Sequence, residues 1–141
     1  MVGKYDLMRS NVGNREARKK KGVIVYGSCV PTQFPDLFNE VFEQYKYPAF
    51  DVCLETVHMN MAGYKLASLI SYSHVENVIV LTVDGSPHCI QLHYLVEDIK
   101  KHFLHNINTK HLVIEKGVLY EVSERAVRKS RHLKALEKMD S

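Results

Sequence analysis

The stretch ENVIVLTVDGSPHC, residues 76–89, passes from an apolar run into a turn and then into the start of a helix. Apolar side chains fill five of the six positions over 78–83. A run that is apolar at nearly every position is typical of a strand with both faces covered, as in the centre of a parallel sheet. Ser86 and Pro87 are residue types that cap and open a helix. The stretch therefore predicts a central parallel strand followed directly by a helix.

The alternation of strand and helix continues on both sides of this stretch. Apolar runs predict further strands at 23–26, 49–53, 111–115 and 118–122, and helical spacing predicts helices at 35–45, 56–71, 87–105 and after Ser123. Strands that alternate with helices form a mostly parallel sheet with helices on both faces. We predict a three-layer α/β fold of the flavodoxin or Rossmann-like type, with about four parallel strands and an antiparallel edge strand at 118–122. In the flavodoxin-like strand order, strands 23–26 and 76–83 flank the switch point where ligands bind.

The first 21 residues differ in composition from the remainder of the chain. They are polar, carry Arg15, Arg18 and lysines at 19–21, and show little periodicity. We expect a basic N-terminal arm over 1–21, flexible or with a short helix around 15–20, that lies outside the core. Residues 22–141 are expected to form a single α/β domain, which is long enough to bury a core of its own.

Overall composition excludes several protein classes. A hydrophobic content of 45% and a net charge of +3 are those of an ordinary globular protein. No apolar run reaches the ~18 residues of a membrane helix, and the N-terminus lacks the apolar segment of a signal peptide. We expect a cytoplasmic protein with no membrane partner. Three cysteines in a reducing compartment indicate free thiols or metal ligands rather than disulfides.

Each of the three cysteines follows a predicted strand and precedes a predicted helix. Cys29 follows the strand at 23–26, Cys53 ends the strand at 49–53, and Cys89 follows the central strand. Because the carboxyl ends of parallel strands share one edge of a sheet, the three thiols are expected to converge there. Open α/β sheets bind their ligands at this edge.

A metal or iron–sulfur site is the first hypothesis for these thiols. Thiolates bind Zn²⁺ and iron–sulfur clusters, and His88 or His58 could supply a further ligand beside Cys29, Cys53 and Cys89. No CxxC pair is present, although most such motifs use one. The alternative is that the cysteines are small buried hydrophobic residues without a ligand.

A nucleophilic cysteine is the second hypothesis. Cys29 would be the nucleophile of a hydrolase or transferase, with His88 or His58 as its base and Asp84 or Glu55 orienting that base.

Two further hypotheses carry weaker signals. The Ser28 and Thr32 hydroxyls could bind the phosphate of a nucleotide or flavin, although no glycine-rich phosphate motif is present. A non-catalytic interaction domain also remains open. The basic arm and the basic last helix lack interleaved aromatic residues and any recognised motif, so we expect no nucleic-acid partner.

The remaining histidines carry no expected role in the site. His74, His102, His105, His111 and His132 are expected to be exposed to solvent because they lie at element ends or on polar faces. His93, four residues after Cys89 on the same helix face, is expected at the edge of the core.

Three strings together carry a family resemblance: GSCVPTQFPDLF (27–38), DVCLETVHMNMAGYKLA (51–67) and VLTVDGSPHCIQLH (80–93). They resemble a group of small prokaryotic proteins loosely labelled ferredoxin-like or iron–sulfur proteins. The resemblance covers most of residues 22–133 and implies a cluster on the three cysteines, although the chain has no C-x₂-C-x₂-C-x₃-C ferredoxin run. The layout is more distantly similar to the cluster-carrying domain of nickel–iron hydrogenase small subunits. Those proteins use several cysteines in the first loop, where this chain has only Cys29.

The combined expectation is a redox-associated protein that holds an iron–sulfur cluster or zinc at the carboxyl edge of its sheet. Its role would be electron transfer or redox sensing with a redox protein partner. The predicted edge strand at 118–122 carries apolar side chains, and unprotected edges tend to be covered, so we also expect a homodimer.

Overall fold

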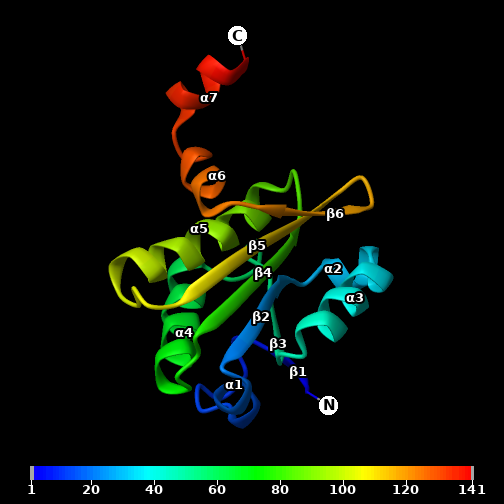
Figure 1. Ribbon diagram of the computed structural model, residues 1–141, viewed down its shortest axis with the longest axis vertical. Coiled ribbons are helices and arrows are strands. Elements are labelled where there is room, and N and C mark those ends of the chain that lie inside the picture. The colour runs from blue at the N-terminus through cyan, green and yellow to red at the C-terminus, as the bar shows by residue number, and fades with distance from the viewer. Residues whose placement is uncertain (1, 141) are drawn as a thin grey trace.

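The computed structural model describes the backbone of residues 2–140 and the side chains of residues 2–139, and it forms one six-stranded sheet (Figure 1). The strands are β1 (Lys4–Asp6), β2 (Gly22–Gly27), β3 (Ala49–Val52), β4 (Asn77–Val83), β5 (Asn108–Glu115) and β6 (Val118–Val122). The helices are α1 (Arg15–Lys20), α2 (Val30–Gln33), α3 (Pro35–Tyr45), α4 (Met59–Tyr72), α5 (Pro87–His102), α6 (Glu124–Lys129) and α7 (Leu133–Asp140).

The sheet has the order β1-β3-β2-β4-β5-β6, and all neighbouring strands are parallel except the antiparallel pair β5–β6. The predicted fold class and the antiparallel edge strand are confirmed. The chain passes from β2 to β3 on one side and then crosses back to β4 on the other. The reversal of direction between β2 and β4 creates the predicted switch point at the carboxyl edge.

Two separate cores cover the two faces of the sheet. Helices α4 and α5 pack on one face against alternate residues of β2 and β4, such as Val25 and Val80. Helices α2 and α3 pack on the other face against the intervening residues, such as Ile24 and Leu81. Both central strands are therefore buried on both sides, which explains their unbroken apolar runs.

Helix starts follow the local capping chemistry. The Ser86 hydroxyl accepts a hydrogen bond from the Cys89 N–H at the start of α5, and Ser123 caps α6 in the same way through Ala126. Both caps confirm the predicted starts. The α5 cap places the Cys89 side chain in the first turn of the helix, beside the carboxyl edge of the sheet.

The N-terminal segment differs from the prediction of an arm outside the core. Strand β1 pairs in parallel with β3, and Leu7 and Ala17 are fully buried. The predicted short helix at 15–20 is present as α1. The prediction was wrong about the core because a three-residue strand leaves no periodic signal. Contacts with distant segments hold β1 in the sheet, including the stacking of Tyr5 on Phe50 of β3 at a centroid distance of 5.1 Å.

The C-terminal helices extend past the end of the sheet (Figure 1). Helix α6 is anchored by buried Val127, whereas Leu133 and Met139 of α7 are exposed. Among the described residues, no helix has the length and apolar character needed to cross a membrane.

Candidate functional site: three thiols at the carboxyl edge of the sheet

All three cysteines line one small cavity at the carboxyl edge. Cys29 follows β2, Cys53 follows β3, and Cys89 lies in the first turn of α5 after β4. The cavity has a volume of about 90 Å³ and is bounded by the following residues: Gly27, Ser28, Cys29, Val52, Cys53, Leu54, Glu55, Ser86, His88, Cys89 and Leu92. The cysteines are free and half-buried. The predicted convergence of the three thiols on one spot is thus present in the structure.

Within this group, Cys29 and Cys89 are the closest neighbours of Gly27. A Cβ atom placed on Gly27 would lie 3.5 Å from Cys89 Sγ and 3.9 Å from Cys29 Sγ. Cys53 has no atom within 4 Å of that point. Because Gly27 has no side chain, the space between it and the sulfurs of Cys29 and Cys89 stays open.

Burial raises the pKa of the Cys29 thiol above its ordinary value, and the neighbouring thiols of Cys89 and then Cys53 raise that pKa further. A thiol with a raised pKa stays protonated at neutral pH, and it is the thiolate that attacks electrophiles. The environment of Cys29 therefore favours a protonated thiol over an activated nucleophile.

Two of the predicted accompanying residues lie at the cavity, and two do not. His88 and Glu55 line it. His58 instead caps α4, where its Nδ1 accepts a hydrogen bond of 3.1 Å from the Asn60 N–H. Asp84 lies in the exposed turn after β4 and does not line the cavity.

The proposed catalytic pairing of Cys29 with histidine lacks a direct contact. Among residues 2–140, no hydrogen bond joins Cys29 to His88 or His58. A general base must lie within hydrogen-bond reach of its nucleophile, or tighten to it when substrate binds. The arrangement therefore gives the nucleophile hypothesis no specific support.

Only one of the two hydroxyls considered for phosphate binding lines the cavity. Ser28 Oγ donates a hydrogen bond of 3.0 Å to the Asp51 carboxylate on the neighbouring strand. Thr32 is an exposed residue of the short helix α2 and does not line the cavity. The Ser28 hydroxyl thus holds the end of β2 against β3.

The thiols lie near one another without forming a complete ligand set. Within residues 2–140, no three side chains of the types His, Cys, Asp or Glu stand in an arrangement that could hold a metal ion. Two of the donors border the space over Gly27, and the third approaches the same cavity from β3.

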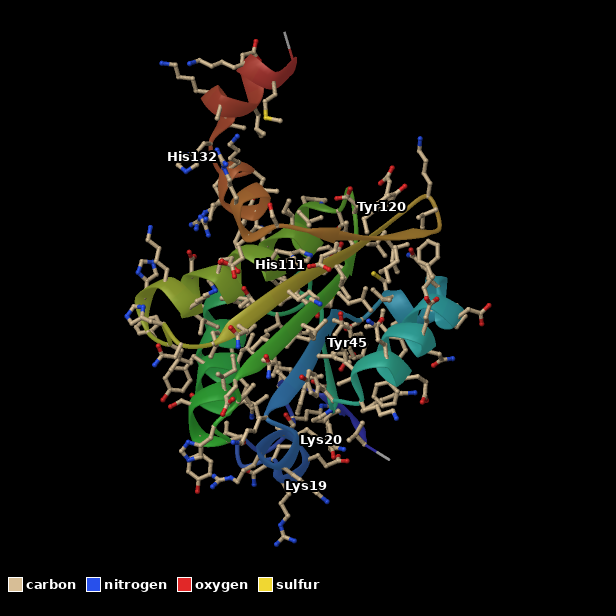
Figure 2. The ribbon with its side chains drawn as sticks, in the orientation of Figure 1. Lys19, Lys20, Tyr45, His111, Tyr120 and His132 are labelled. Carbon is tan, nitrogen blue, oxygen red and sulfur yellow. The ribbon has the colours of Figure 1, made fainter. Side chains whose placement is uncertain are left out.

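A buried polar network on the α5 face of the sheet is the feature that sequence reasoning missed. Thr82 Oγ1 lies 2.7 Å from His93 Nε2, and the Nδ1 atoms of His93 and His111 are 2.8 Å apart. His111 Nε2 lies 2.6 Å from Glu97 Oε2. His111, labelled beside β5 in Figure 2, is only 1% exposed, so its predicted exposure was wrong.

The Glu97 carboxylate is the acceptor at one end of this network. The Glu97 carboxylate accepts hydrogen bonds from His111 and from the Thr109 hydroxyl. Between the two histidines one Nδ1–H donates to the other Nδ1, and the tautomer of each ring sets the direction of this bond and of the bond between His93 Nε2 and the Thr82 hydroxyl. Burial, and then the charge of His111, lowers the pKa of His93 to about 3, so His93 is neutral in this arrangement.

Two signals in the sequence were available for the network. His93 and Glu97 are four residues apart on one face of α5, and His111 alternates in β5 with the apolar Leu112. These signals identify the network only when the tertiary structure is known, because it places β5 next to β4 and under α5. An isolated histidine in a strand does not show which face of the sheet it occupies.

Two larger cavities lie away from the thiols. An apolar groove of about 820 Å³ runs between α4 and α5, and its lining includes Gly63, Tyr64 and Leu95. A polar cavity of about 750 Å³ lies between α5 and α6, with Glu97 and Arg128 among its lining residues. Neither contains a cysteine, so size alone does not select the thiol site; its donor chemistry and its place at the switch point do.

A family model described as a Rossmann-like domain matches residues 17–140, and the chain therefore belongs to this family. That description carries no ferredoxin-like or iron–sulfur label. No curated protein and no solved structure matches the chain significantly.

Proposed function

We propose that this member of the Rossmann-like domain family is a redox-associated protein that binds a thiophilic metal centre through Cys29, Cys53 and Cys89. The centre would be zinc or an iron–sulfur cluster. One observation carries the proposal: three thiols that follow three adjacent parallel strands line a single cavity at the switch point. Sulfur donors favour zinc and iron–sulfur clusters over hard cations such as Mg²⁺ and Ca²⁺.

The donor set fits such a centre in number and in chemistry. Structural and catalytic zinc sites use three or four ligands, and three cysteines with one histidine is a known combination. His88 lines the cavity and is the available fourth donor, whereas His58 is held at the cap of α4. Glu55, which also lines the cavity, offers a carboxylate in the same place.

The thiol side chains would have to rotate to bind. Because no three donor side chains of the described residues stand close enough to hold a metal ion, the sulfurs must approach to the Zn–S distance of about 2.3 Å. Rotation about each Cα–Cβ bond moves a sulfur without moving the strand ends. Binding also requires deprotonation, and the raised pKa of Cys29 makes uptake depend on pH.

When bound, a zinc ion would supply a structural or Lewis-acid centre, and a cluster would supply one-electron redox chemistry. The hydrogen bond between Ser28 and Asp51 joins the ends of β2 and β3, after which Cys29 and Cys53 follow. The protein fixes Cys89 through the Ser86 cap of α5.

The experiment is anaerobic purification of the full chain followed by absorption spectroscopy and elemental analysis. Absorption near 400 nm with iron and sulfide identifies a cluster, and stoichiometric zinc without colour identifies a zinc site. Cys53→Ser is expected to lose the metal, whereas His58→Asn, the matched control outside the cavity, retains it. A metal-free chain after anaerobic reconstitution with both metals would contradict the proposal.

The proposed partners are a redox protein and a second copy of the chain. Strand β6 is the outer edge strand, and Val118 and Tyr120 on it are each 50% exposed. An uncovered edge of this kind supports pairing of two copies through β6. Light scattering at micromolar concentration should give the mass of a dimer, and Tyr120→Lys should reduce it to that of a monomer. A monomeric mass for the unaltered chain would contradict the dimer.

A further inference from the structure

We propose that Cys29 and Cys89 form a reversible disulfide by exchange with small disulfides, which makes the pair a redox-controlled modification site. This inference rests on the thiol site proposed above and concerns its regulation, because a disulfide would remove two of its three sulfur donors. It requires only two of the three cysteines. That difference separates it experimentally from metal binding.

The positions of the sulfurs select this pair. Cys29 Sγ and Cys89 Sγ both lie within 4 Å of the point where a Cβ of Gly27 would stand, and no atom of Cys53 does. A disulfide needs an S–S distance of about 2.05 Å. Because Gly27 has no side chain, nothing from that residue blocks the approach of the two sulfurs.

The electrostatics of Cys29 indicate the same neighbour. After burial, the Cys89 thiol is the strongest influence on Cys29 and acts both through its charge and through a thiol hydrogen bond. Cys53 acts on Cys29 more weakly and only through its charge. Cys89 is therefore the thiol that interacts most strongly with Cys29.

Small oxidants have access to the pair. Cys29 and Cys89 are half-buried rather than fully enclosed, so each is partly exposed to solvent, and both line the small cavity together with Glu55 and His88. Access and proximity are two conditions for exchange, and the third is the thiolate fraction, so the exchange should run faster at alkaline pH.

Oxidised glutathione is a suitable oxidant, and the exchange balances in two steps. A thiolate of the pair attacks one glutathione sulfur, the glutathione S–S bond breaks, and one glutathione leaves as a thiolate that takes up a proton. The second cysteine then loses its proton and attacks the protein sulfur of the mixed disulfide, and the other glutathione leaves. The two protein thiols lose two electrons and two protons, and oxidised glutathione is reduced to two glutathione molecules.

The sequence makes the product easy to identify. Trypsin cleaves after Lys46, Lys65 and Lys100, so the three cysteines fall in the separate peptides 22–46, 47–65 and 66–100. The full chain, treated with a chelator, is incubated with oxidised glutathione, alkylated in denaturant and digested without reduction. Mass spectrometry then reports the linkage of each cysteine.

The expected result is the loss of two of the three free thiols per chain, with peptide 22–46 joined to peptide 66–100 and Cys53 alkylated. Reduced glutathione should reverse it. Cys53→Ser should keep the cross-link, and Cys29→Ser and Cys89→Ser should each abolish it. Free thiols throughout, glutathione carried separately on each cysteine, or a cross-link through Cys53 would overturn the inference.

The two proposals fail separately. A chain that binds no metal but forms the cross-link contradicts the metal centre and leaves the disulfide established. A chain that binds metal but never forms the cross-link supports the metal centre and contradicts the disulfide. Because the peptide map of the unaltered chain gives the primary result, a variant that fails to fold does not decide the outcome.

Discussion

The Nδ1 atoms of His93 and His111 face each other at 2.8 Å in the interior of the protein, where both side chains are almost fully buried. Only one of these two nitrogens can carry a proton while the hydrogen bond is kept. Glu97 fixes the arrangement at the other side of His111 by accepting from its Nε2. The pair therefore ties β5 to α5 through a contact that depends on protonation.

Protonation of His93 should destabilise the fold in mild acid. Burial, and then the charge of His111, lowers the pKa of His93 to about 3 in the folded chain, against an ordinary value of about 6.5. In the unfolded chain His93 is thus protonated below pH ~6.5, whereas in the folded chain it stays neutral down to pH ~3. The stability contribution is present above pH ~6.5 and is lost as pH falls toward ~3.

Urea unfolding between pH 7.5 and 5 measures this loss, which should be on the order of 2 kcal/mol. His93→Gln should remove most of this pH dependence. His74→Gln, at an exposed position, should leave it unchanged. A wild-type free energy of unfolding that stays flat across this range would contradict the buried neutral His93.

Removal of the Glu97 carboxylate should cost much stability. Glu97→Ala leaves the buried His111 N–H and the Thr109 hydroxyl without this acceptor. Breaking a buried pair by removing one partner costs about 3–5 kcal/mol. Asp98→Ala is the matched control on the same helix, because its bridge to Arg131 lies at the surface and should contribute less than about 1 kcal/mol. Equal losses of unfolding free energy in the two variants would show that the buried network contributes no more to stability than a surface ion pair.

Alkylation of Cys29 should require more alkaline conditions than that of an ordinary thiol. Burial and the neighbouring thiols raise its pKa, so the reactive thiolate forms above the usual midpoint of about pH 8.5. The rate of iodoacetamide labelling in peptide 22–46, followed against pH, should rise later in the folded chain than in urea. Fast labelling of the folded chain at neutral pH would instead support Cys29 as an activated nucleophile.

Two glycines of β2 should respond differently to alanine. At Gly27 the added Cβ meets only Cys89 and Cys29 at ordinary contact distances, so Gly27→Ala should fold with a stability change below about 1 kcal/mol. The methyl group would border both sulfurs and should slow their cross-linking. At Gly22 the added Cβ would overlap the ring of Tyr47, and Gly22→Ala should lose about 1–3 kcal/mol. Thermal unfolding of both variants, with the glutathione assay on Gly27→Ala, measures these effects; cross-linking at the wild-type rate would contradict the role of this space.

The sequence by itself determined the fold class and the place of the thiols. The apolar runs of β2 and β4 predict central parallel strands because a strand covered by helices on both faces has no side that faces solvent and needs polar residues. The positions of Cys29, Cys53 and Cys89 after strands then placed them at one edge, because parallel strands end on the same side. Both conclusions depend on local periodicity and on connection rules that hold for any α/β chain.

Only the tertiary structure decided which residues meet. It brought β1 into the sheet, buried His111 against Glu97, placed the sulfurs of Cys29 and Cys89 beside Gly27, and left His58 and Asp84 outside the cavity. Each of these results depends on contacts between segments far apart in the chain. Local patterns show which way a side chain faces relative to its own element, whereas strand order and register determine what lies opposite it.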